Sequence, residues 1–86
     1  MSETDRETVD TAAVWPEDAE EEEGVVANWF AREGSRVEEG DVLCEIQIEK
    51  VSVDVPAPAT GTLAEILLAE DEEFERGDAL AVIEPA

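Results

Sequence analysis

The chain has 86 residues, of which 25 are Asp or Glu and five are Lys or Arg, so its formal charge is −20 and it contains no histidine. Such an acidic surface repels phosphate backbones, which disfavours nucleic-acid binding. No apolar run approaches the ~20 residues that cross a bilayer, and the first residues do not resemble a signal peptide. His-dependent catalytic dyads and His-ligated zinc are excluded, and a single cysteine fits a reducing cytoplasm.

The acidic residues are concentrated at the start of the chain, and this uneven distribution predicts two parts. We expect residues 1–8 to form an acidic flexible tail and residues 9–86 to form one domain, because the apolar fraction of 43% is sufficient for a folded core. Self-repulsion of an acidic surface is screened in concentrated salt. The charge therefore predicts a halophilic source, with an acidic mesophile protein as the alternative.

Two segments of the chain resemble each other. Residues 24–47 align with residues 61–84 without a gap, a shift of 37 positions (24 to 61). Identical pairs include Gly24/Gly61 and Glu33/Glu70, and the Gly-Asp pair at Gly40 recurs at Gly77. We expect the two segments to form equivalent halves of one fold.

Each half has the pattern of β structure. Apolar strands are predicted at residues 25–31 and 42–48 and again at 63–68 and 79–83, with one further strand at 9–15 that ends before Pro16. The repeated Gly40 and Gly77 suit turns that need a positive φ. Residues 65–75 also have helical propensity, but their counterparts include Gly34 and Ser35, which favours strand and turn. The predicted fold is a small all-β sandwich or barrel of two sheets related by a pseudo-twofold axis.

Residues 42–55 predict a tight hairpin with Glu49 and Lys50 at its turn. In this register Ile48 faces Val51, and the next apolar pairs follow at every second residue, so one face is wholly apolar. Shifting the turn by one residue mixes apolar and polar side chains on both faces. Glu-Lys is not a favoured turn sequence, so the flanking strands must hold it.

This register places the only lysine, Lys50, at the exposed tip of the hairpin and between the two repeats. A lysine in a turn is commonly just a solvated side chain. Here the chain uses arginine for every other base, and β-branched residues stiffen the hairpin. An amine held on a rigid hairpin suits enzymatic acylation, which a guanidinium could not replace.

At these residues the sequence resembles the lipoyl domains of the biotinyl/lipoyl-carrier family, over roughly residues 12–86. The resemblance implies a flattened β-barrel of two four-stranded sheets and assigns Lys50 as the site of covalent cofactor attachment. Gly40 and Gly61 match turn glycines of the family, and Gly77 repeats the first of them. Biotin carriers have methionine on both sides of the lysine. Glu49 and Val51 fit a lipoyl domain better, although Val51 departs from the usual alanine.

The resemblance implies a free-standing carrier domain with no catalytic residue of its own and no metal. Lipoate joined to Lys50 as an amide would carry acyl groups and reducing equivalents in a 2-oxo-acid dehydrogenase-type complex. The implied partners are a lipoate ligase or lipoyl transferase and the decarboxylase, acyltransferase and dihydrolipoamide dehydrogenase components. The alternatives are a biotin carrier subunit of a carboxylase and an unmodified interaction module. We expect a monomer.

The same resemblance assigns partner recognition to the two neighbours of the lysine, Glu49 and Val51, and to an acidic loop. The expected loop residues are Glu17, Asp18, Glu20, Glu21, Glu22 and Glu23. The alternative that this loop binds a cation is weaker, because four consecutive acids cannot all point at one ion. Cys44 lies on the apolar face of the hairpin, and Trp15 and Trp29 are expected in the core or on a sheet face.

Overall fold

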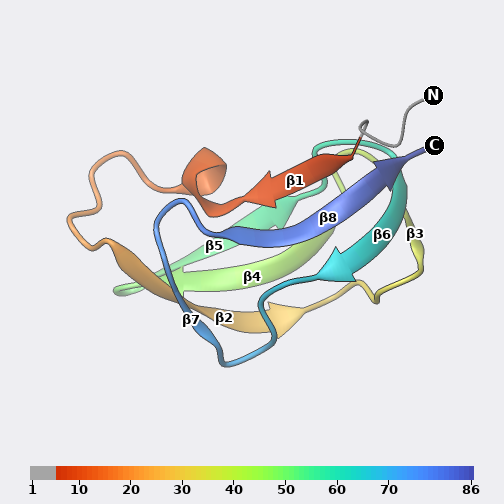
Figure 1. The fold of residues 1–86 in the computed structure, drawn as a ribbon. Coiled ribbons are helices and arrows are strands. Elements are labelled where there is room, and N and C mark those ends of the chain that lie inside the picture. Colours follow the sequence, from red (N-terminus) through yellow and green to blue (C-terminus); the bar gives the residue numbers. More distant parts are fainter. Residues whose placement is uncertain (1–5) are drawn as a thin grey trace.

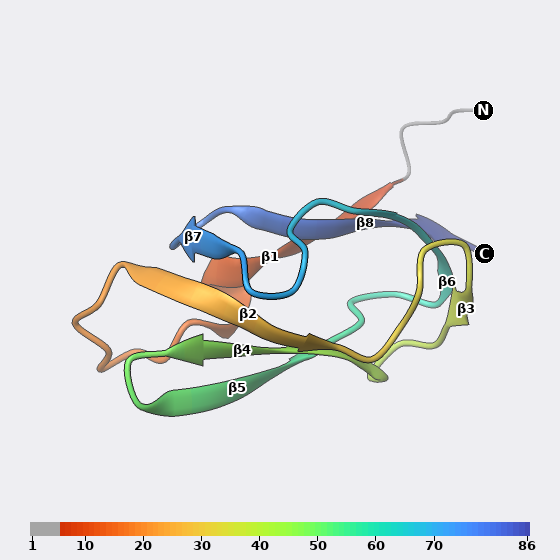
Figure 2. The same cartoon turned by 90° about the horizontal axis from the view of Figure 1, so that it is seen from below.

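Two antiparallel sheets of four strands each make up the computed structural model, which describes residues 6–86. The strand orders are β1-β8-β6-β3 and β5-β4-β2-β7, and Figure 2 shows the two layers from the side. In chain order the elements are β1 (Glu7–Asp10), a 3-10 helix η1 (Thr11–Val14), β2 (Glu23–Trp29), β3 (Arg36–Val37), β4 (Val42–Ile48), β5 (Val51–Pro56), β6 (Gly61–Ile66), β7 (Glu73–Glu75) and β8 (Ala79–Pro85). The predicted all-β class with two sheets is confirmed.

The internal repeat appears directly in the sheet topology. Strands β6, β7 and β8 occupy the places in the fold that β2, β3 and β4 occupy, and β1 takes the place of β5. Bulges occur at matching positions, between Val26 and Asn28 in β2 and between Leu63 and Glu65 in β6. The expected pseudo-twofold relation of the two halves is confirmed.

The core lies between the sheets and is built from the inward side chains of both. Leu43, Ile46 and Ile48 of β4 are fully buried, as are Leu80 and Ile83 of β8. From Cys44 to Ile48 buried residues alternate with less buried ones in the period of two that a half-buried strand requires, and a bulge before Cys44 lets both Leu43 and Cys44 be buried. This packing fixes β4 and β8, an inner strand of each sheet, and β4 in turn fixes the hairpin that it forms with β5.

The N-terminal prediction was wrong in two respects. Residues 7 and 8 do not belong to a tail, because Glu7 pairs with Ile83 and Thr8 with Val82 in the β1–β8 ladder. Residues 1–5 of the expected tail lie outside the described residues. The strand predicted at residues 9–15 ends at Asp10, whose carboxylate accepts a 2.8 Å hydrogen bond from the Ala12 N–H and caps a 3-10 turn.

Of the three glycines that were expected in turns, two lie in turns and one lies in a strand. Gly40 and Gly77 have φ of 93° and 97°, the left-handed region that favours glycine, so these two are confirmed as turn residues. Gly61 is instead the first residue of β6 and is buried. A Cβ at Gly61 would lie 2.0 Å from the Glu84 carbonyl oxygen, so glycine is needed there for close approach of two strands and not for a turn.

Among residues 6–86 no helix is long and apolar enough to cross a membrane.

Candidate functional site

The hairpin around Lys50 has the register that the apolar pattern predicted. Strands β4 and β5 pair Ile48 with Val51 and Ile46 with Val53. On the opposite face Gln47 pairs with Ser52. Since side chains alternate along each strand, this pairing directs the apolar set of both strands to one side of the hairpin and confirms the prediction.

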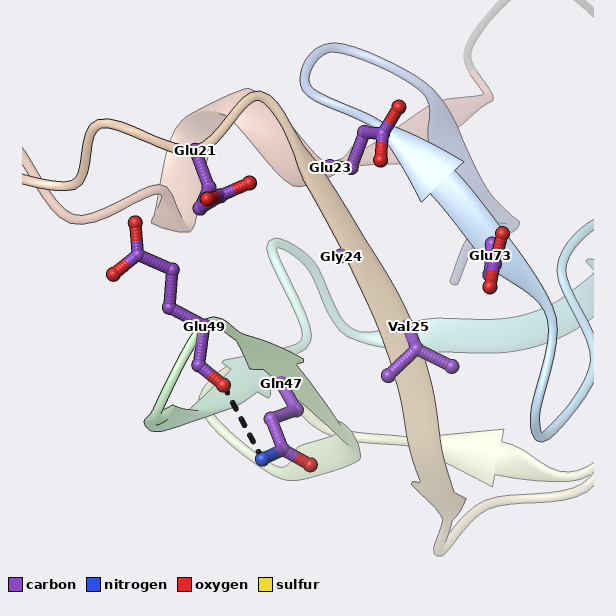
Figure 3. A pocket seen from close by; sticks show the side chains of 7 residues that line it. All are labelled: Glu21, Glu23, Gly24, Val25, Gln47, Glu49 and Glu73. Carbon is purple, nitrogen blue, oxygen red and sulfur yellow. Dashed lines mark hydrogen bonds between the residues drawn. The ribbon is translucent and has the colours of Figure 1, made fainter.

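Glu49 and Lys50 form the turn itself, and the backbone there is strained. Glu49 has φ of 57°, a left-handed conformation that costs a non-glycine residue roughly 1–2 kcal/mol. The Gln47 side-chain amide donates a 3.4 Å hydrogen bond to the Glu49 carbonyl across the turn (Figure 3). The strands on either side therefore hold a turn that its own sequence does not favour.

Burial decreases steeply toward the tip of the hairpin. Ile48 is fully buried, while its partner Val51 is 49% exposed and Lys50 is exposed. Within residues 6–86 Lys50 takes part in no ion pair. Figure 1 shows the turn between β4 and β5 at one end of the sandwich, with the C-terminal residue near the other end. Lys50 thus lies exposed in the turn at one end of the sandwich.

The acidic loop between η1 and β2 is fastened to the sandwich at two points. The indole N–H of Trp15 donates a 3.1 Å hydrogen bond to the Glu21 carbonyl, and the Arg76 main-chain N–H donates one of 2.8 Å to the Glu22 carbonyl. The Arg76 guanidinium lies 3.7 Å from the Glu22 carboxylate and 5.9 Å from the centre of the Trp15 ring. The end of this loop therefore has a defined position beside the hairpin.

Loop and hairpin together line an open hollow of about 430 Å³ beside the turn (Figure 3). Glu49 extends from the hairpin toward the loop that carries Glu21, and Glu23 and Glu73 lie on the neighbouring strands β2 and β7. The lining residues are Glu21, Glu23, Gly24, Val25, Gln47, Glu49 and Glu73. Four glutamates line this hollow and no basic residue does, so the surface beside the turn is negative and suits a basic partner surface.

The structure groups only part of the recognition set that was expected from the sequence. Glu49, Glu21 and Glu23 share the hollow. The remaining expected loop acids, Glu17, Asp18, Glu20 and Glu22, do not line it. Val51 is exposed beside the lysine. Sequence reasoning missed Glu73, because only the pairing of β2 with β7, in which Val25 faces Glu73, brings it to this site.

Cys44, Trp15 and Trp29, which were also singled out in the sequence, are packed into the domain. Cys44 is fully buried, and this burial raises the pKa of its thiol to about 12, so it is a poor nucleophile. Trp15 is buried against Phe74 in an edge-to-face contact, and Trp29 is half-buried with its N–H bonded to the Leu68 carbonyl, as expected for core and sheet-face residues. In the described part of the chain no three Cys, Asp or Glu residues are placed to hold a metal ion.

Comparison with known proteins identifies the family. The model of the biotin/lipoyl family, described as biotin-requiring enzyme, matches residues 15–83. The fold is that of a lipoyl domain: a solved lipoyl domain of the 2-oxoglutarate dehydrogenase complex from Azotobacter vinelandii is 30% identical, with a TM-score of 0.69, over 91% of this chain and 99% of that one. The chain belongs to the biotinyl/lipoyl-attachment family.

Curated relatives lie on the lipoyl side of this family. The dihydrolipoyllysine-residue acetyltransferase component of the pyruvate dehydrogenase complex is 37% identical in Staphylococcus aureus and 39% identical in Staphylococcus epidermidis, in each case over 62 residues. These matches cover 72% of this chain and 14% of each relative. The chain therefore spans about one seventh of the length of these relatives.

Fold similarity by itself does not distinguish the two attachment types. Kluyveromyces lactis urea carboxylase matches with a TM-score of 0.76 at 26% identity, over 96% of this chain and 6% of that chain. This TM-score is higher than that of the solved lipoyl domain, but the identity is lower. The higher identity to lipoyl proteins and the residues on either side of Lys50 make a lipoyl domain the better fit.

Proposed function

We propose that Lys50 carries lipoate as an amide and that the chain is a non-catalytic carrier in a 2-oxo-acid dehydrogenase-type complex. The observation that carries this proposal is the exposed amine of Lys50 at a turn whose strand register is fixed by buried Ile46 and Ile48. The group fits this site, because attachment needs an accessible primary amine and Lys50 is the only lysine of the chain. When bound, lipoate supplies a dithiolane that accepts an acyl group and electrons.

Lys50 and the β4–β5 hairpin have separate tasks in this proposal. Lys50 would supply the neutral amine that attacks an activated lipoyl carbonyl delivered by the ligase, and the amide forms as the activating group leaves and the nitrogen gives up a proton. The β4–β5 hairpin holds that amine away from the sandwich, so that a modifying enzyme and successive active sites reach it without unfolding the domain. Such tethering raises the local concentration of the carried group at each site.

Recognition falls to the acidic surface beside the turn. We infer that a lipoate ligase or lipoyl transferase recognises the domain through Glu49 and Val51. Partners of the dehydrogenase complex would bind the acidic loop with Glu21 and Glu23. The glutamates beside the turn would steer a basic partner surface toward Lys50 and speed association at low salt. The partners in this proposal are decarboxylase, acyltransferase and dihydrolipoamide dehydrogenase components, met by a monomeric domain in the cytoplasm.

Intact mass of protein from its native host tests the attachment. We expect a lipoyl adduct that Lys50→Arg abolishes, since arginine keeps the positive charge but offers no acylatable amine. A protein that gains no mass in the host contradicts the carrier function and favours an unmodified interaction module. A biotin adduct on Lys50 would instead assign the chain to the carboxylase side of the family.

A further inference from the structure

A second exposed surface lies at the end of the sandwich away from the Lys50 hairpin. It is an open hollow of about 510 Å³ beside β3 and the start of β4. Val42 and Ile48 are the two ends of β4, so the hollow and the lysine turn are about 20 Å apart along the strand at 3.3 Å per residue. Figures 1 and 2 both show β3 and the β4–β5 turn at opposite ends of the molecule.

Apolar and positively charged side chains meet in this hollow. Phe30 is 60% exposed and Val42 is 42% exposed, and both line it together with Arg32 and Arg36. Large apolar side chains that remain in water next to each other are typical of interaction surfaces. Aromatic residues and arginine are also the residue types that interfaces favour most strongly.

Arg32 and Arg36 differ from the other arginines in their interactions within residues 6–86. Arg6 forms an ion pair with Glu84, and Arg76 lies against Glu22 and Trp15. Within residues 6–86 neither Arg32 nor Arg36 forms an ion pair or a side-chain hydrogen bond, despite the 25 acids of the chain. One acid of the hollow, Asp41, is already bonded to the Glu38 N–H at 2.9 Å.

The internal repeat shows that the fold does not require these side chains. The Phe30 N–H bonds the Leu43 carbonyl at 2.8 Å, and the equivalent Leu67 N–H bonds the Leu80 carbonyl at 2.8 Å. The same backbone thus carries Leu67, Ala69, Glu73 and Ala79 where the first repeat has Phe30, Arg32, Arg36 and Val42. The second repeat thus forms the same backbone hydrogen bond without an aromatic ring or a positive charge at these positions.

From this contrast we propose that the surface formed by Phe30, Arg32, Arg36 and Val42 docks an acidic protein segment, one that presents an apolar side chain flanked by carboxylates. The apolar side chain would cover Phe30 and Val42, and the carboxylates would bind the two guanidiniums in bidentate fashion. A phosphate-rich ligand would use the arginines but leave the apolar pair uncovered. The net charge of −20 opposes any acidic ligand, which favours a short segment that brings only the few carboxylates the two guanidiniums pair with. A second copy would bring a further −20 and is disfavoured.

A peptide-display selection on the unmodified chain tests the proposal, because a random library samples acidic and non-acidic segments alike. Peptides that bind the variant F30L/R32A/R36E are first removed from the library. This variant carries the residues of the other repeat at these three positions and is therefore expected to stay folded. We expect enriched peptides to combine Asp or Glu with a neighbouring apolar residue. The proposal is overturned if selection on the wild-type chain enriches no peptide relative to the pre-cleared library, or enriches only peptides without Asp or Glu.

Binding of one selected peptide, followed by amide chemical shifts in NMR, locates the contact. Shifts should concentrate at residues 30–36 and 42–43, and the triple variant should bind about tenfold or more weakly, while Leu67→Ala on the equivalent face should bind as the wild type does. Lys50→Arg should not change this affinity, which separates this surface from the carrier function. Shifts elsewhere, unchanged binding by the triple variant, displacement by inorganic phosphate, or concentration-dependent dimerisation through this face would each overturn it.

Discussion

Glu33 and Glu70 occupy equivalent positions in the two repeats, and each carboxylate accepts a hydrogen bond from the main chain of the other repeat. Glu33 is bonded by the Ile66 N–H at 2.7 Å and Glu70 by the Trp29 N–H at 2.9 Å. Ile66 and Trp29 are the last residues of β6 and β2. The two glutamates therefore close the ends of two central strands and link the halves of the sandwich reciprocally.

Removing either carboxylate should destabilise the domain by a similar amount. We expect Glu33→Ala and Glu70→Ala each to lower the free energy of unfolding by about 1–2 kcal/mol, because a main-chain N–H loses a charge-assisted hydrogen bond. Urea unfolding followed by tryptophan fluorescence measures the change. Glu39→Ala is the matched control, since it removes one charge from an exposed carboxylate that accepts no hydrogen bond within residues 6–86. Equal stability of Glu33→Ala and this control would contradict the prediction.

The two kinds of glycine should respond differently to substitution by alanine. Gly61→Ala places a Cβ against the Glu84 main chain, where only movement of a strand can relieve the clash, so we expect a loss of about 3 kcal/mol or more. At Gly40 there is open space, and only the positive φ is unfavourable, which costs about 1–2 kcal/mol. Thermal unfolding of the two variants compares these costs. A smaller loss at Gly61 than at Gly40 would contradict the close-approach explanation.

The hairpin could be predicted from the sequence because its information is local. Alternation of apolar and polar residues from Cys44 to Val55 has one register that leaves both faces uniform, and the structure has that register. The repeat likewise predicted that the halves are equivalent. Both signals depend only on spacing along the chain, which the sequence displays directly.

What could not be predicted depends on contacts between distant segments. Glu73 joins the hollow beside Lys50 only because β7 pairs with β2. Gly61 could be noticed as a repeated glycine, but the need for it arises from Glu84, far along the chain. One local signal was available and missed: Asp10 before Thr11 is a typical helix-capping residue, and it ended the strand predicted at residues 9–15.

Cys44 should be chemically inert in the folded domain. Its buried thiol, with a pKa raised from 9.0 to about 12, remains protonated at neutral pH and cannot be reached by reagents. We expect a disulfide reagent such as DTNB at pH 8 to label native protein at least tenfold more slowly than protein in urea, with Cys44→Ala as the unlabelled control. Rapid labelling of native protein would show that the β4–β5 hairpin opens readily.

The same thiol makes stability depend on alkaline pH. Because the folded state holds the pKa of Cys44 above its unfolded value, the folded state binds the proton more tightly. This contribution is complete below about pH 9 and is lost as the pH rises toward 12. We expect Cys44→Ala to be less stable than the wild type near pH 7 because of the cavity, but to lose less stability between pH 8 and 10. Parallel losses would contradict titration of this group.

Salt should stabilise the domain, as the halophilic expectation requires. With a net charge of −20, repulsion among exposed carboxylates opposes the compact state, and KCl screens it. We expect the free energy of unfolding in urea to rise between 0.1 and 2 M KCl. A variant with glutamine at three exposed positions, Glu39, Glu65 and Glu75, should show a smaller rise. A rise of the same size in both proteins would point to a general salting-out effect and not to charge.

Glu49 should have opposite effects on stability and on modification. Its positive φ is unfavourable for glutamate and easier for asparagine, so we expect Glu49→Asn to raise the free energy of unfolding by about 0.5–1 kcal/mol. If the carboxylate also serves a ligase, as proposed, the same variant should be lipoylated several-fold more slowly, measured by intact mass during incubation with lipoate ligase, lipoate and ATP. Glu49→Gln separates the two effects, since it keeps the length and the strain but removes the charge. A Glu49→Gln variant modified as fast as the wild type would show that the ligase reads the hairpin shape and not its acid.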